Sequence, residues 1–181
     1  MNPTLEKLRQ NYFKLGLLLA FLLILNMVLG GRLTYFYVVI IFIAGGALST
    51  FYHIFFKGPI HFELVKLATI LSSVAYGAFT GILVGLLASL VGRVISGRLD
   101  QMAIVSIIAI PVIAVLASAF RTADITTLGI VLVFVYTAII FPLVMLMGGN
   151  IGFGIIYCGT NIFFNVLLFI YVAPFVKGLI V

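Results

Sequence analysis

Long apolar runs separated by short polar breaks make up almost the whole chain. The runs cover residues 13–30, 33–56, 64–95, 102–120, 125–147 and 151–176. A helix needs about 20 apolar residues to cross a hydrocarbon core ~30 Å thick, so each run predicts a membrane-spanning helix. The pattern therefore predicts an all-α, polytopic transmembrane bundle that forms a single integral membrane domain over residues 1–181.

The run over residues 64–95 is too long for one ordinary span. At 1.5 Å per residue, an unbroken helix of this length would measure roughly 48 Å. A break at Tyr76-Gly77-Ala78 would divide the run near residue 77. The expected total is six spans, or seven if both halves cross the membrane. Lys and Arg near the span ends place the N-terminus in the cytoplasm with either count.

Composition supports this interpretation and narrows the function. Hydrophobic residues make up 65% of the chain and charged residues 8%, whereas soluble domains average about 25% charged residues. We therefore expect a multi-pass protein of the cell membrane, surrounded by the lipid bilayer. The net charge of +6 reports topology and contact with anionic headgroups, so we expect no nucleic-acid partner.

Few side chains are available for catalysis. The sequence has no Ser/His/Asp set and no phosphate-binding loop, so we expect no enzymatic activity and no cofactor. Glu63, Asp100 and Asp124 all fall at predicted span ends, so no carboxylate lies within a span, which argues against a proton-coupled carrier. The acidic, histidine and cysteine side chains of the whole sequence are Glu6, Glu63, Asp100, Asp124, His53, His61 and Cys158.

A ladder of small residues is the most specific pattern in the sequence. Gly77, Gly81, Gly85 and Ser89 follow one another at four-residue spacing, which places them on one helix face where another helix backbone can approach closely. The partner is either another helix of this chain or a separate subunit. The cluster from Ala44 to Ala47 has the same two interpretations.

Polar residues within the last predicted span form a second candidate site. Asn161 and Asn165 are four residues apart and share a helix face with Tyr157 and Thr160. Buried amides must find hydrogen-bond partners in a membrane. Asn161, Asn165 and Tyr157 therefore either join helices or line a small-molecule site. Asn26 is also at membrane depth, and kinks are expected at prolines inside spans, which are Pro111, Pro142 and Pro174.

Both histidines and an acid gather in residues 52–63. His53 and His61 stand eight positions apart across a Gly-Pro turn, and Glu63 follows. This spacing matches no recognised metal motif, so we expect no metal and interpret the segment as an interfacial anchor with an aromatic belt. Glu63 and Lys66 are three residues apart at a helix start and can pair.

Two stretches resemble a known transporter family. They are GPIHFELVKLATILSSVAYGAFTGILVGLLASLVG, from Gly58 to Gly92, and GTNIFFNVLLFIYVAPFVKGL near the C-terminus. They are similar to helices of the substrate-binding S-components of energy-coupling-factor transporters, and the second stretch is also similar to the rod-shape D membrane protein, which shares their fold. The resemblance implies a small-molecule site within the bundle and partner subunits that supply energy. The family's small-residue coupling motif could correspond to Ala44 and Ala47.

A second resemblance covers residues 64–147. Its features are the long apolar run, VGRVISGRLDQ, and a span with the central Pro111. They are similar to Yip-type multi-span proteins, which are non-enzymatic trafficking or partner-binding factors. We therefore expect a transport-related membrane subunit that binds a small molecule and depends on partner membrane subunits, with a non-enzymatic scaffold or trafficking factor of Yip or rod-shape D type as the alternative.

Overall fold

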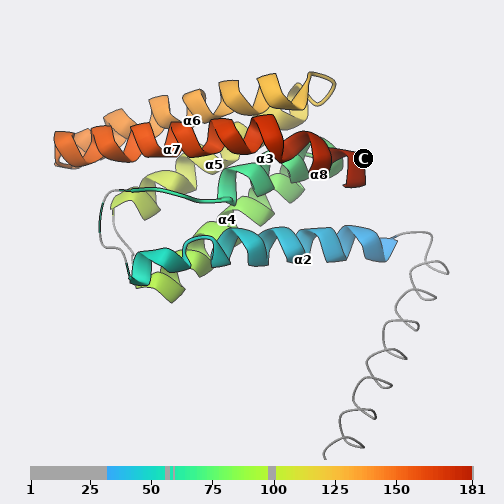
Figure 1. Ribbon diagram of the computed structural model, residues 1–181, viewed down its shortest axis with the longest axis horizontal. Helices are drawn as coiled ribbons and strands as arrows, with labels where there is room; N and C mark the ends of the chain where they lie inside the picture. The colour runs from blue at the N-terminus through green and yellow to red at the C-terminus, as the bar shows by residue number, and fades with distance from the viewer. Residues whose placement is uncertain (1–31, 56–57, 59, 98–100, 181) are drawn as a thin grey trace, which may run out of the picture. The chain divides into compact units, whose positions relative to one another are not determined.

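The computed structural model describes residues 32–55, 58, 60–97 and 101–180. The chain divides into two compact units, Met1–Val38 and Val39–Val181, and the second contains most of the described residues. All regular elements of the described residues are helices (Figure 1). They are α2 (Arg32–Leu48), the 3₁₀ helix η1 (Phe51–Ile54), α3 (Val65–Tyr76), α4 (Ala78–Ser96), α5 (Gln101–Ala119), α6 (Ile125–Leu146), α7 (Ile151–Tyr171) and α8 (Ala173–Ile180).

Five helices of the described residues are long and apolar enough to cross a membrane. They are Thr34–Ile54, Ala78–Ser96, Gln101–Ala119, Ile125–Leu146 and Ile151–Tyr171. These findings confirm a helical bundle compatible with a membrane. The predicted span over residues 13–30 and the amide of Asn26 lie outside the described residues, as does the N-terminus.

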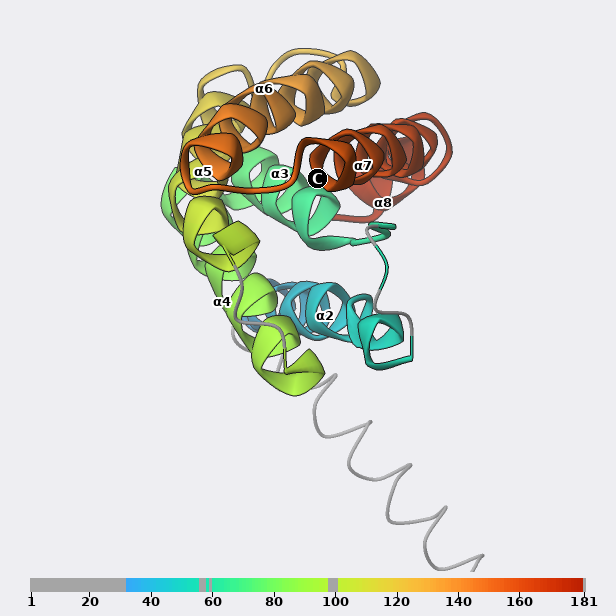
Figure 2. The same ribbon diagram turned by 90° about the vertical axis from the view of Figure 1, so that its left-hand side faces the viewer.

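Helix α3 lies at the centre of the second unit. It has 12 residues, too few to cross a bilayer, and all of its side chains from Val65 to Val74 are buried. It contacts α4, α5, α6, α7 and α8, and Figure 2 shows it with α5 on one side and α7 on the other. A helix that is buried on every face is typical of a bundle core, although α3 also carries the polar side chains of Lys66, Thr69, Ser72 and Ser73.

The long run over residues 64–95 breaks at Gly77, as the sequence predicted. Gly77 has a φ of +93°, a conformation that favours glycine because it lacks a Cβ atom. Helix α4 then packs back against α3, and the small-residue ladder makes the close contact. A Cβ atom at Gly81 would overlap Ser73 Oγ, and one at Gly85 would overlap Thr69 Oγ1.

The last predicted span, residues 151–176, is wrong at its C-terminal end. Helix α7 ends at Tyr171, and a separate helix α8 begins at Ala173. Pro174 therefore lies in the first turn of α8, where its missing N–H costs no hydrogen bond, rather than inside a span. Pro111 and Pro142 lie within α5 and α6, as predicted.

Candidate functional site

The chain between η1 and α3 is fixed by hydrogen bonds to its surroundings. The Tyr52 hydroxyl donates to the Ile60 carbonyl at 3.0 Å and accepts from the Phe62 N–H at 2.7 Å. The His61 N–H donates to Thr160 Oγ1 of α7 at 3.1 Å, and the Leu64 N–H donates to Ser49 Oγ at 2.9 Å. These bonds set the direction in which His61 and Glu63 enter the bundle.

Four ionisable side chains meet where this connection enters the bundle, and we call His61, Glu63, Lys66 and Arg93 the charged cluster. His61 Nε2 lies 2.6 Å from Glu63 Oε1, and Lys66 Nζ lies 3.7 Å from Glu63 Oε2. The pairing of Glu63 with Lys66 is the one that the sequence predicted. All four residues are buried, with relative exposures of 5% or less. Such burial is costly for charges unless they are paired.

Other elements of the bundle complete the surroundings of the charged cluster. Lys66 Nζ lies 4.8 Å from the centre of the Tyr136 ring of α6, a cation–π geometry. Arg93 Nε, in the last turn of α4, donates to Ser89 Oγ at 3.2 Å. Ser89 Oγ lies 3.4 Å from Ser106 Oγ of α5. Helices α3, α4, α5 and α6 therefore all contribute to its environment.

The environment favours a neutral imidazole beside an ionised carboxylate. Burial lowers the pKa of His61 below its ordinary value, and Lys66 and Arg93 act in the same direction against the opposing effect of Glu63. Burial alone would raise the pKa of Glu63, but the hydrogen bond from His61 and the positive charges of Lys66 and Arg93 outweigh it and lower that pKa. At neutral pH we therefore assign a neutral His61 next to a charged Glu63.

A small cavity with both polar and apolar lining residues adjoins the charged cluster. It leaves about 20 Å³ for the centre of a water-sized sphere, and about 10–15 Å³ is enough for one water molecule. The cavity in this structure therefore has room for one water or one ion. The ionisable or hydroxyl-bearing residues among those lining it include His53, His61, Glu63, Arg93, Ser96 and Tyr157.

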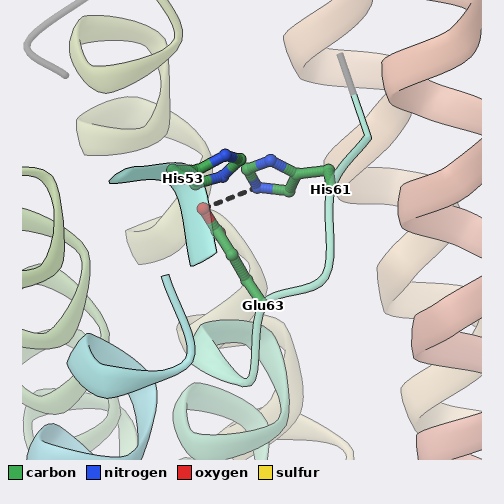
Figure 3. Close-up of side chains that lie close together, drawn as sticks. All are labelled: His53, His61 and Glu63. Atoms are coloured by element: carbon green, nitrogen blue, oxygen red, sulfur yellow. Dashed lines mark ion pairs between the residues drawn. The ribbon is translucent and has the colours of Figure 1, made fainter. Parts of the chain in front are cut away.

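His53 joins His61 and Glu63 to form a compact set of donor atoms. One ligand atom from each lies within 4.8 Å of the others, and all three residues are buried. Figure 3 shows the Glu63 carboxylate pointing toward the two imidazole rings. These three side chains therefore point into the protein, whereas Phe55 of the same segment is exposed.

The residues predicted to bind a ligand occupy two different environments. Tyr157 lines the cavity, its ring centre lies 4.3 Å from that of His61, and its hydroxyl is buried next to Tyr136 of α6. Asn161 and Asn165, which we call the asparagine pair, do not line this cavity. Both are fully buried.

The asparagine pair is hydrogen-bonded along α7 and to α6. Asn165 Nδ2 donates to the Asn161 carbonyl at 2.8 Å and to Asn161 Oδ1 at 3.1 Å. Asn161 Nδ2 donates to Thr137 Oγ1 of α6 at 3.3 Å. Asn165 Oδ1 has no partner among the described residues. The geometry is that of a polar contact between two helices.

The residues predicted to form a packing face have neighbours within this chain. Gly81 and Gly85 contact α3, and Ser89 contacts α5, whereas Gly77 forms the break between helices. In the second small cluster Ala47 is buried and Ala44 is exposed. Its neighbour Gly46 lies against Ala88 of α4.

Sequence reasoning missed Arg93 and the burial of Lys66. A signal for Arg93 was present, because it stands four residues after Ser89 and so continues the spacing of the small-residue ladder. It therefore shares the buried face of α4. No local signal brings His53, His61 and Glu63 together, because their meeting depends on the path of the chain between η1 and α3.

No protein-family model, no curated protein and no solved structure matches this chain.

Proposed function

We propose that this protein is a transport-related subunit of the cell membrane that binds a small molecule or ion within its helix bundle. The observation that carries the proposal is the charged cluster beside a small cavity, inside a bundle of apolar helices. Charged residues buried inside membrane proteins are rare, and those that occur often mark substrate and ion pathways. We place an ion-sized ligand at the cavity that Tyr157 lines.

Stability alone is a poor explanation for the charged cluster. Replacing a buried ion pair with well-packed apolar side chains is often neutral or stabilising. The Glu63–Lys66 pair is more than 94% buried on both sides, and Lys66 Nζ has no partner within hydrogen-bond distance among the described residues. A site for a ligand accounts for charges that packing does not require.

Energy for transport is assigned to partner subunits. The sequence contains no phosphate-binding loop. The resemblance to S-components of energy-coupling-factor transporters also supports a subunit that binds the ligand while partner subunits supply the energy. The proposal includes six or seven spans and a cytoplasmic N-terminus. The exposed apolar side chains of the bundle would then contact lipid and the partner membrane subunits.

Native mass spectrometry of the gently solubilised protein tests this proposal. We expect the wild-type protein to carry a small molecule or ion and a partner subunit. Tyr157→Phe removes one hydroxyl from the cavity and should reduce ligand occupancy. Asn165→Leu is the matched control, because it changes α7 two turns further on without touching the cavity lining, and it should keep the ligand.

Two other outcomes would contradict the proposal in different ways. Loss of ligand in Asn165→Leu but not in Tyr157→Phe would move the ligand site to the asparagine pair. An empty bundle that brings down another membrane protein would favour the alternative, a non-enzymatic scaffold or trafficking factor of Yip or rod-shape D type.

A further inference from the structure

The donor atoms around the cavity have the composition of a transition-metal site. His53 and His61 offer imidazole nitrogens, and Glu63 offers a carboxylate oxygen. Imidazole suits Zn²⁺, Fe²⁺, Ni²⁺ and Cu²⁺, whereas Mg²⁺ and Ca²⁺ prefer oxygen ligands alone. Two histidines and one glutamate are also the three protein ligands of a known kind of open zinc site, whose fourth position binds water or substrate.

The surroundings of these donors resemble those of a prepared site. The Tyr52 ring packs against His53 with centres 4.1 Å apart, and the Tyr157 ring packs against His61. Lys66 lies next to Glu63 Oε2 and leaves Oε1 directed at His61. The two ring contacts hold the imidazoles in place, and groups that orient the ligands of a metal raise the affinity for that metal. The cavity of about 20 Å³ supplies space for a water molecule.

We propose that His53, His61 and Glu63 bind one divalent transition-metal ion of the Zn²⁺ type, with water from the adjoining cavity as a further ligand. This ion would be the ligand of the site described above, so the proposal rests on the proposed function and names its ligand class. His61 Nε2, which now faces Glu63 Oε1, would bind the metal, and its ring would carry the proton on Nδ1.

Two neighbouring cations oppose a metal at this position. Lys66 Nζ lies 3.7 Å from Glu63 Oε2, and Arg93 lines the same cavity. The metal and Lys66 would therefore compete as counter-charges for Glu63. This competition limits the affinity, and a transport site must release its ion as well as bind it. It also provides a test that a purely structural ion pair would fail.

Titration of the full, untagged chain with Co²⁺ in detergent is the first experiment, because Co²⁺ reports its ligands by visible absorption. We expect one Co²⁺ per chain with absorption bands of a site containing nitrogen ligands, displaced by Zn²⁺. His53→Gln, His61→Gln and Glu63→Gln should each weaken binding roughly 100-fold or more, since even the loss of an outer-shell partner costs 10–100-fold. Absence of stoichiometric binding to the wild-type chain would overturn the metal site.

Two control variants separate this site from adventitious binding. Asn165→Leu changes a buried residue of α7 that does not line the cavity and should leave Co²⁺ affinity unchanged. Cys158→Ser removes the free thiol and should also have no effect. If Cys158→Ser abolishes the bands while His53→Gln keeps them, the bound metal belongs to the thiol and the proposal is wrong.

Lys66→Met provides a test in the opposite direction. Removing the competing cation should tighten Co²⁺ binding by at least about tenfold, because a unit charge at this distance acts strongly in a buried site. Zn²⁺ should then raise the melting temperature of Lys66→Met more than that of the wild type. A site that is only an ion pair would show neither effect.

Failure of the metal site and failure of the proposed function give different results. An organic molecule in the native mass spectrum, together with no Co²⁺ binding, would overturn the metal site and leave the transport proposal intact. Stoichiometric Co²⁺ binding by a complex that moves no metal into lipid vesicles would support the metal site and overturn the transport proposal.

Discussion

The charged cluster and the asparagine pair are both buried polar groups in one helical bundle, yet they differ in charge and in the number of elements that contribute to them. The asparagine pair is neutral and lies on one helix, and its bonds run along α7 and to Thr137 of α6. The charged cluster draws on the connection after η1, α3 and α4, and it leaves a cavity beside it. Neutral amides can join helices at little cost, whereas buried charges need an additional reason to be present.

The largest expected effect is that of removing the single acid from the charged cluster. Glu63→Gln would leave Lys66, which is 1% exposed, without a carboxylate partner among the described residues. Breaking a buried ion pair from one side costs about 3–5 kcal/mol, so we expect a loss of this size in the free energy of unfolding. Denaturant titration in mixed micelles, followed by circular dichroism, measures it.

The double variant Glu63→Gln/Lys66→Met is the control for that loss. It removes both charges together, so most of the lost free energy of unfolding should return, as a double-mutant cycle would reveal. If the double variant is as unstable as Glu63→Gln, the cost comes from the shape of the glutamate site and the electrostatic contrast with the asparagine pair disappears.

The next largest effect is the loss of stability at low pH, which should depend on the charged cluster and not on the asparagine pair. The pKa of His61 is lowered in the folded protein, so the unfolded chain binds more protons, and stability falls as the pH drops below the ordinary histidine value of about 6.5. The lowered pKa of Glu63 has the same sign at lower pH, because its contribution is lost as the carboxylate becomes protonated.

Melting temperatures between pH 8 and pH 4.5 measure this effect. The wild type and Asn165→Leu should lose stability in parallel as the pH falls, because the asparagine pair carries no charge. His61→Gln should show a smaller loss below pH 6.5. Equal pH profiles for the wild type and His61→Gln would mean that other groups cause the loss.

The sequence predicted the helices well because hydropathy is a local property. The ends of α5 and α6 lie within one residue of the predicted spans, 102–120 and 125–147. Gly77 was found because a run too long for one span needs a break. The separate helix α8 was missed because the apolar run continues through Val172, where α7 has ended. In the sequence, only Pro174 marks the end of α7.

The site was less accessible from the sequence than the fold. The pattern pointed to Tyr157 because it shares a helix face with Asn161, and the structure places that tyrosine at the cavity. It placed Glu63 at a span end, where a carboxylate is expected to meet water. The burial of Glu63 depends on α3 being a central helix, a tertiary feature that no local pattern records.

The smallest expected effect is that of removing the asparagine pair. Asn161→Leu/Asn165→Leu replaces both amides with apolar groups of similar size, which removes the bonds without leaving one partner stranded within the pair. Hydrogen bonds between membrane helices average about 0.6 kcal/mol, so we expect the free energy of unfolding to fall by roughly 1 kcal/mol or less, with ligand occupancy unchanged. A loss as large as that of Glu63→Gln would show that neutral and charged groups are equally indispensable here, and the charged cluster would no longer stand out as the functional one.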